Sequence, residues 1–215
     1  MPRSVTRGLY AITPDQADTS KLVAAVESAL RGGAAMVQYR NKSADAATRH
    51  AQAAALAACC KSGGVPLIVN DDARLAAEVD ADGAHLGAAD GDLASARQFL
   101  GPHRLLGASC YNRLELAESA LDAGVDYVAF GSFFASSTKP GAVRAAPGLI
   151  GAIKRNRPQV CVAAIGGITL ANALPLVVAG ADWLCVVTAL FDAPDVEAAA
   201  RGFSRMFTTA SQPGS

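Results

Sequence analysis

The sequence predicts an α/β fold, and within that class a (β/α)8 TIM barrel built as a single domain. Short apolar runs of strand length alternate along the chain with alanine-rich stretches of helical spacing. Eight such pairs follow one another, and eight is the number of βα units that closes this barrel. Three segments, ALRGGAAMVQYR, ALDAGVDYVAFG and VVAGADWLCVV, repeat the order of helix end, glycine-containing turn and strand. The count and the repeated joint favour the barrel over its alternative, a doubly wound open sheet.

The strands are expected where apolar runs have strand length, because a parallel sheet of this kind is covered on both faces. They span 8–13, 35–40, 66–70, 83–87, 104–109, 126–131, 160–166 and 182–188. Almost every run ends in a polar or glycine-rich group. In a barrel these groups meet at one rim, formed by the C-terminal ends of the strands, where the active site of such a fold lies.

Helices are expected between the strands, at 19–31, 44–62, 72–79, 91–100, 112–123, 145–156, 169–179 and 192–208. No linker, low-complexity segment or block of charge divides the 215 residues. We therefore expect one domain over 1–215, with its core at about 8–207 and a polar, disordered tail at 208–215.

The overall charge of the chain argues against nucleic acid and anionic membranes as partners, because 19 Lys and Arg balance 19 Asp and Glu. The apolar runs are too short to span a bilayer, and MPRSVTRGLYAIT lacks the apolar stretch of a signal peptide. The five cysteines contain no C-x-x-C pair, which argues against a disulfide or zinc scaffold. We expect a cytoplasmic protein whose basic residues bind small anions. The sequence leaves open whether it forms a homo-oligomer.

A cationic cluster follows the second expected strand. In VQYRNK, Gln38, Arg40 and Lys42 stand at every second position, so in a strand they share one face. Arg and Lys are the usual partners of phosphate groups. Together with Lys139, they favour an anion site at the rim; the alternative is that they only solvate a loop.

Two carboxylates end neighbouring expected strands. Asp71 and Asp90 would lie about one strand spacing, roughly 5 Å, apart and could share one ion. Mg²⁺ takes one or two carboxylates and fills its other positions with water and substrate phosphate. Because Asp is also a favoured helix N-cap, capping is the alternative for Asp71, Asp72 and Asp90. The pair beside the cations favours a metal site.

Further anion-binding groups are expected at later strand ends. The seventh and eighth strands end in AIGGI and VVTAL, at the position where many such barrels bind phosphate through backbone amides. For the Gly-Gly pair, an ordinary turn is the alternative. The long loop FASSTKPGA adds the hydroxyls of Ser136, Ser137 and Thr138 beside Lys139; an ordinary surface loop is the alternative.

No covalent nucleophile is indicated by the sequence. It contains neither H-E-x-x-H nor G-x-S-x-G, and His50, His85 and His103 are scattered. His85 lies within an expected strand and is interpreted as structural. The sequence therefore indicates a site that positions phosphates and stabilises their charge.

Taken together, LYAIT, VQYRNK, LIVNDD, ADGAHLG, SSTK, AIGGIT and AGADWLCVVTAL resemble the thiamine-phosphate synthase family, in family order from about Gly8 to Phe207. The resemblance implies a TIM-barrel transferase that uses Mg²⁺. Its reaction would join 4-amino-2-methyl-5-hydroxymethylpyrimidine diphosphate to 4-methyl-5-hydroxyethylthiazole phosphate, giving thiamine phosphate and diphosphate. The family is thought to react dissociatively, so that the C–O bond to diphosphate breaks before the thiazole nitrogen attacks.

The resemblance also implies roles for individual residues. Gln38 would meet the pyrimidine, and Asp71 and Asp90 would bind Mg²⁺. The implied diphosphate contacts are Arg40, Lys42, Asn70, Ser109 and Lys139, of which Arg40, Lys42, Lys139 and Ser109 would be catalytic. The implied thiazole-phosphate contacts are Ser136, Ser137, Thr138, Gly166, Gly167, Val187 and Thr188.

The sequence departs from the family pattern at a few positions. Ala88 stands where a Gln is common, Ser136 and Thr188 exchange one hydroxyl for another, and Tyr111 stands where a His is frequent. A related family of thiazole tautomerases depends on a His near that place. The alternatives to the synthase are therefore such a tautomerase and a non-catalytic barrel that binds thiamine phosphates.

Overall fold

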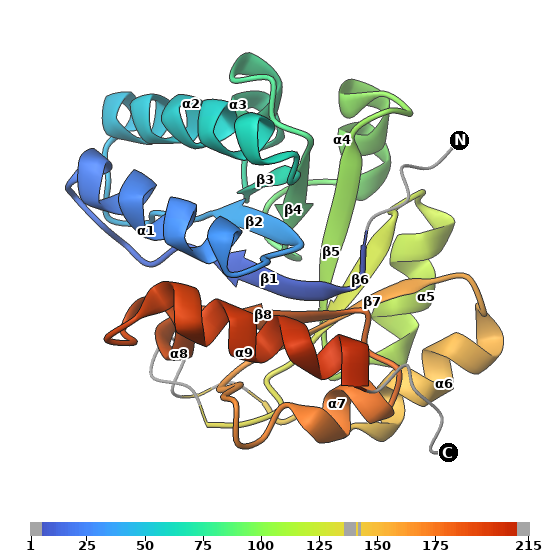
Figure 1. Cartoon of the computed structure of the whole chain (residues 1–215). Coiled ribbons are helices and arrows are strands. Elements are labelled where there is room, and N and C mark those ends of the chain that lie inside the picture. Colours follow the sequence, from blue (N-terminus) through green and yellow to red (C-terminus); the bar gives the residue numbers. More distant parts are fainter. Residues whose placement is uncertain (1–5, 136–140, 142, 210–215) are drawn as a thin grey trace.

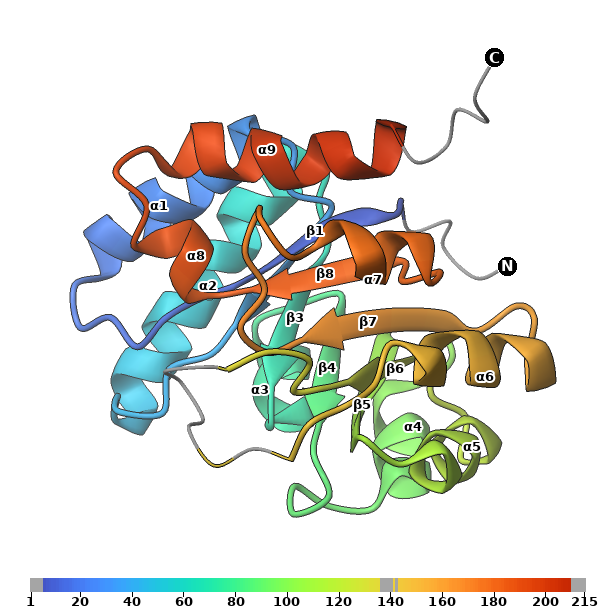
Figure 2. The same ribbon diagram turned by 90° about the horizontal axis from the view of Figure 1, so that it is seen from below.

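The computed structural model describes residues 6–135, 141 and 143–209, and it has the predicted barrel architecture. Eight parallel strands close in the order β1-β2-β3-β4-β5-β6-β7-β8, because β1 pairs with both β2 and β8. The open-sheet alternative is therefore excluded. Figures 1 and 2 show the helices outside this ring of strands.

All eight strands form where the sequence predicts them. They are β1 (Gly8–Ile12), β2 (Met36–Tyr39), β3 (Leu67–Asn70), β4 (Gly83–Leu86), β5 (Leu105–Tyr111), β6 (Tyr127–Phe130), β7 (Cys161–Ile165) and β8 (Trp183–Val186). Only β5 runs beyond its expected end. A register irregularity between Ser109 and Tyr111 lets it continue pairing with β6.

The helices also follow the prediction, with two differences. They are α1 (Thr19–Arg31), α2 (Ala46–Gly63), α3 (Ala73–Glu78), α4 (Leu93–Leu100), α5 (Leu114–Asp122), α6 (Gly148–Asn156), α7 (Leu174–Val178), α8 (Thr188–Phe191) and α9 (Val196–Thr209). The short helix α8 directly after β8 was not expected. Helix α7 is shorter than expected because a turn closed by Asn172, whose side chain accepts a hydrogen bond from the Thr169 amide, precedes it.

The C-terminal helix extends into the segment that was expected to form a tail. Helix α9 includes Thr208 and Thr209, which the sequence analysis assigned to the tail. The remainder of that expected tail, 210–215, lies outside the described residues. No helix in the described part of the chain has the length and apolar character that a bilayer crossing requires.

Two apolar layers hold the barrel together, since alternate strand residues face opposite sides of the sheet. The inner layer consists of Tyr10, Ile12, Met36, Ile68, Tyr127, Ala129, Ala163, Trp183 and Cys185. The larger outer layer lies between the strands and the helices, with Val26, Leu56 and Phe203 fully buried in it. Met36 packs inside the barrel, two residues before Gln38 on the same face of β2.

The three repeated joints depend on glycines in the left-handed backbone region. Gly33, Gly124 and Gly180 follow α1, α5 and α7 with φ of 90°, 89° and 104°. Side chains disfavour this region because the Cβ atom crowds the following carbonyl. The glycines therefore let each helix reverse directly into the next strand.

Gly124→Ala is expected to lower the free energy of unfolding by about 1–2 kcal/mol, the cost of a left-handed backbone with a Cβ atom. Gly151, inside α6, is the matched control because its added Cβ would meet only Arg155 Nη1 at 3.6 Å. Gly151→Ala is expected to raise the same quantity by roughly 0.5–1 kcal/mol. Urea denaturation measures both; equal effects would contradict the role of the joint.

Candidate active site

The sequence-predicted site residues that the structure describes lie at the C-terminal ends of the strands. Gln38 is the last residue but one of β2, Asn70 ends β3, and Asp71 follows Asn70 directly. Ser109 lies near the end of β5, and the turns after β7 and β8 carry the predicted phosphate contacts Gly166, Gly167, Val187 and Thr188. Ser136, Ser137, Thr138 and Lys139 lie outside the described residues.

Arg40 is held at the rim by the loop that follows β1. Its amide donates to Thr13 Oγ1 at 2.8 Å, and the Thr13 hydroxyl donates back to the Arg40 carbonyl at 2.9 Å. Its guanidinium pairs with Asp15 Oδ1 at 3.1 Å, and the same oxygen accepts the amide of Lys42 at 2.9 Å. Asp15 thus organises both cations. The sequence analysis missed it, although a polar residue just after an apolar strand was the available signal.

Lys42, Asp71 and Asp90 form a second ionic group. Lys42 Nζ lies 2.9 Å from Asp71 Oδ2, and the Asp90 carboxyl, when protonated, donates a hydrogen bond to Asp71. The Asp90 carboxylate also accepts the Gly87 amide at 2.7 Å. These contacts bring together the cation and the two carboxylates that the sequence analysis assigned to one site.

The pKa values of the two carboxyls are shifted in opposite directions, because each carboxyl is influenced by the other. Partial burial raises the pKa of Asp71, but hydrogen bonds from Lys42 and Asp90 outweigh it and leave the pKa lowered. Burial and the negative charge of Asp71 raise the pKa of Asp90, against the hydrogen bond from Gly87. Two carboxyls this close repel when both are ionised, so a cation between them would be favourable.

The capping alternative holds for Asp72 and fails for the other two. Asp72 caps α3, because its side chain accepts the Leu75 amide at 2.9 Å, and it also pairs with Arg49. Helix α4 is capped by Asp92, not by Asp90. Asp71 takes a left-handed backbone, with φ of 63°, and directs its carboxylate to Lys42. Asp71 and Asp90 therefore remain available for another role.

The donor set at the rim fits magnesium better than a transition metal. Within the described residues, no group of three or more His, Cys, Asp and Glu side chains could hold a metal ion. Mg²⁺ needs fewer protein ligands, since one or two carboxylates suffice when water and a substrate phosphate complete its shell. Asp71 and Asp90 match that requirement.

Ser109 ends a hydrogen-bonded chain that crosses the barrel interior. Its hydroxyl lies 2.9 Å from His85 Nε2, and His85 Nδ1 lies 3.1 Å from the Tyr127 hydroxyl. Tyr127 lies 2.9 Å from the Tyr10 hydroxyl, which accepts a hydrogen bond from Gln38 Nε2 at 2.8 Å. Two predicted substrate contacts, Gln38 and Ser109, are thus joined through three residues that the sequence analysis did not assign to the site.

The glycine pair after β7 is required by packing. Gly166 and Gly167 have φ of 105° and 62°, and Cβ atoms there would lie 2.0 Å from Ser132 Oγ and 2.1 Å from the Ala135 carbonyl oxygen. The loop after β6 therefore presses against this turn. No backbone hydrogen bond between described residues takes its proton from Gly166, Gly167, Val187 or Thr188. Within the described part of the chain, these four amides therefore have no backbone acceptor outside regular helices and strands.

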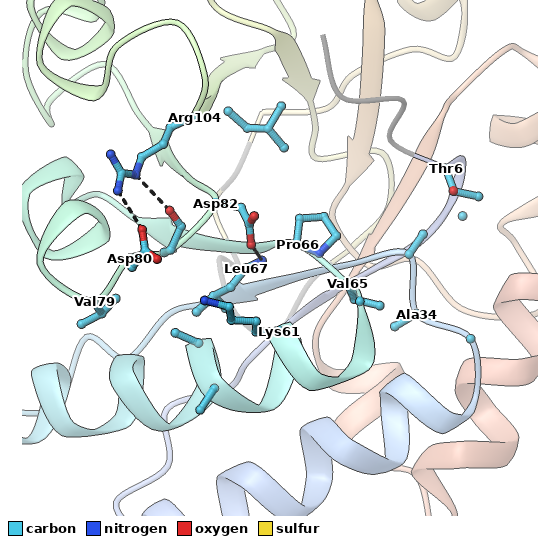
Figure 3. A pocket seen from close by; sticks show the side chains of 18 of the residues that line it. Thr6, Ala34, Lys61, Val65, Pro66, Leu67, Val79, Asp80, Asp82 and Arg104 are labelled. Atoms are coloured by element: carbon cyan, nitrogen blue, oxygen red, sulfur yellow. Dashed lines mark hydrogen bonds and ion pairs between the residues drawn. The ribbon is translucent and has the colours of Figure 1, made fainter. Parts of the chain in front are cut away.

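A cavity of about 1180 Å³ lies at the opposite end of the barrel (Figure 3). Its lining includes Gly8, Leu67 and Leu105, which begin β1, β3 and β5. Arg104 in its wall pairs with Asp80 at 3.0 Å. Because it faces the N-terminal ends of the strands, this cavity is separate from the rim that gathers the predicted site residues.

Asp72→Ala is expected to lower the free energy of unfolding by about 1 kcal/mol, because it removes the cap of α3. Asp71→Asn should leave stability nearly unchanged, since Asn tolerates the left-handed backbone at this position. Urea denaturation of the two variants compares them directly. A larger loss for Asp71→Asn than for Asp72→Ala would mean that Asp71 has a structural role.

Comparison with known proteins gives a consistent result. The sequence matches the family model described as thiamine monophosphate synthase over residues 9–190. A thiamine-phosphate synthase of Thiobacillus denitrificans is 56% identical over 205 residues, covering 95% of this chain and 97% of the relative. One of Aromatoleum aromaticum is 54% identical over 207 residues, covering 96% and 99%. The solved thiamine phosphate pyrophosphorylase from Pyrococcus furiosus has a TM-score of 0.83 at 30% identity, covering 95% and 97%.

Proposed function

The chain belongs to the thiamine monophosphate synthase family, and we propose that it makes thiamine phosphate by a dissociative, Mg²⁺-assisted reaction at the C-terminal rim. The substrates would be 4-amino-2-methyl-5-hydroxymethylpyrimidine diphosphate and 4-methyl-5-hydroxyethylthiazole phosphate. The transferred group is the pyrimidinylmethyl group, and the products are thiamine phosphate and diphosphate.

The ionic chain at the rim is the observation that carries this proposal. Arg40 pairs with Asp15, Lys42 pairs with Asp71, and the carboxyls of Asp71 and Asp90 influence each other's pKa. When all five groups are ionised, two cations face three carboxylates, which leaves one negative charge in excess. A diphosphate would be repelled by that excess unless a divalent cation entered with it.

Asp71 and Asp90 would hold Mg²⁺, which would neutralise charge on the departing diphosphate. Arg40, Lys42 and Ser109 would donate hydrogen bonds to the diphosphate oxygens, and Asn70 would lie beside them. Lys139 would add a further cation. Such donors stabilise the charge that develops as the bond to the leaving group breaks.

The proposed reaction needs no nucleophile from the protein. The C–O bond breaks and its electron pair leaves with diphosphate, and the lone pair of the thiazole nitrogen then forms the C–N bond to the pyrimidine methylene cation. Gln38 would fix the pyrimidine. The amides of Gly166, Gly167, Val187 and Thr188, with the hydroxyls of Ser136, Ser137 and Thr138, would anchor the thiazole phosphate. Two anchors hold the reacting atoms in line.

The first test is to mix the purified protein with both substrates and follow thiamine phosphate by fluorescence after oxidation. We expect product with Mg²⁺ and loss of product when EDTA is added. Product formation unchanged by EDTA would contradict the metal assignment. No product from folded protein that still binds thiazole phosphate would favour the tautomerase or the non-catalytic barrel instead.

Arg40→Ala is expected to lower kcat by about a hundredfold or more, as loss of a charge-stabilising donor does elsewhere. Its matched control is Arg157→Ala. Arg157 directly follows α6 and forms an ion pair with Asp122. Steady-state kinetics measures kcat, and thermal unfolding verifies that both variants fold. A wild-type kcat in Arg40→Ala would remove this residue from the mechanism.

A further inference from the structure

The buried chain of hydrogen bonds inside the barrel has a direction that can be worked out by counting protons. It runs from Gln38 through Tyr10, Tyr127 and His85 to Ser109, side chains that come from five different strands. Gln38 and the three central residues are at most 7% exposed. A hydroxyl has only one proton to donate, so each bond in the chain constrains the next.

The counting starts at Gln38, whose Nε2 donates to the Tyr10 oxygen. If Tyr10 then donates to Tyr127, the Tyr127 proton goes to His85 Nδ1, and His85 Nε2 carries a proton that it donates to Ser109. If Tyr127 donates to Tyr10 instead, the Tyr10 hydroxyl proton has no acceptor among the five linked side chains. A buried donor left without a partner costs about 1–3 kcal/mol, which selects the first arrangement.

Aromatic packing holds the participants in place. The Tyr127 ring stacks on His85 with centroids 5.5 Å apart and meets the rings of Tyr10 and Trp183 edge to face. A Cβ atom on Gly107 would lie 2.0 Å from Tyr127 Cζ, so this glycine makes room for the ring. Burial raises the pKa of both Tyr10 and Tyr127, so both remain protonated and able to donate.

We propose that this chain is a positioning relay that fixes His85 in the Nε2–H tautomer and leaves the Ser109 hydroxyl proton free for an anionic ligand. At the other end, Gln38 keeps its carbonyl oxygen for a donor, such as the exocyclic amino group of an aminopyrimidine. Tyr10, Tyr127 and His85 are the positioning residues. The inference rests on the proposed function for the identity of the ligands. The His85 tautomer and the direction of the hydrogen bonds are properties of the protein without ligands.

The direction of the relay matters because its reverse would have opposite consequences at both ends. With the Gln38 amide turned over, every bond inverts, His85 carries its proton on Nδ1, and Ser109 gives its proton to His85 Nε2. Ser109 would then present only lone pairs to a diphosphate and repel it. The donor that a leaving diphosphate needs therefore agrees with the direction obtained by counting protons.

The test that needs no substrate is ¹⁵N NMR of the protein labelled with [¹⁵N]histidine, at mildly alkaline pH. His85→Gln identifies the His85 signals among those of His50 and His103. We expect a protonated Nε2 and an unprotonated Nδ1. The Nδ1–H tautomer, an imidazolium or a mixture of tautomers would overturn the relay, whether or not the protein makes thiamine phosphate.

A kinetic test then asks whether the relay acts through Ser109. Tyr127→Phe removes the donor to His85 and is expected to lower kcat/KM by about tenfold or more, the scale of a hydrogen bond to a charged group. In a Ser109→Ala background the same change should have little further effect, because the residue it positions is gone. Independent, multiplicative losses would overturn the coupling.

The matched control is Tyr39→Phe, which removes another buried tyrosine hydroxyl. Tyr39 donates to Gln52 Oε1 at 3.0 Å on the helix side of the sheet. Its loss should lower thermal stability without changing kcat/KM or the His85 signals. Equal effects of Tyr39→Phe and Tyr127→Phe on the His85 signals would show that the relay has no special role.

Discussion

Closure of the parallel sheet commits alternate residues of every strand to one shared interior, and the candidate site is built from that interior. Because β1 pairs with both neighbours, no strand has a free edge, and Met36 and Gln38 of one strand face inward together. Apolar residues fill the inner core, whereas polar residues approach the rim. Among the described residues, every buried side-chain nitrogen and oxygen has a hydrogen-bond partner. Polar groups can therefore stand inside the barrel only as members of connected chains.

The rim follows a related constraint, because charges gathered in one place must be balanced before any ligand arrives. Asp15 balances Arg40 and Asp71 balances Lys42, so each cation is already oriented. The backbone of Arg40 is further fixed by two hydrogen bonds with Thr13. Groups held in this way need little rearrangement when charge develops on a ligand, which is the physical basis of electrostatic preorganisation. In the proposed site, the unbalanced carboxylate of Asp90 would supply the excess negative charge that attracts a cation.

The fold and the strand-end residues could be predicted from the sequence, because periodicity and glycine joints are local signals. Gly33, Gly124 and Gly180 take the backbone that their positions predict. The partners of the site residues could not be predicted, because they depend on which side chains meet across the barrel. Tyr10 and Tyr127 are 117 positions apart and read simply as core residues. The Gly166–Gly167 turn was predicted for its freedom to approach an anion, whereas close packing against the loop after β6 also requires it.

The pair of His85 and Ser109 shows why the direction of a hydrogen bond matters more than its length. A serine hydroxyl 2.9 Å from an imidazole nitrogen is also the arrangement of a nucleophile and its general base. In that arrangement the imidazole accepts the serine proton, and the oxygen becomes able to attack. In a relay that starts at Gln38 and passes through two tyrosines, the hydrogen bond between His85 and Ser109 has the opposite direction, because the imidazole donates to the serine oxygen. In the proposed reaction, the serine would then keep its proton and stabilise the departing diphosphate without competing for the pyrimidine methylene cation. The same two residues can thus serve charge stabilisation instead of covalent catalysis, and the choice is made by tyrosines deep in the barrel.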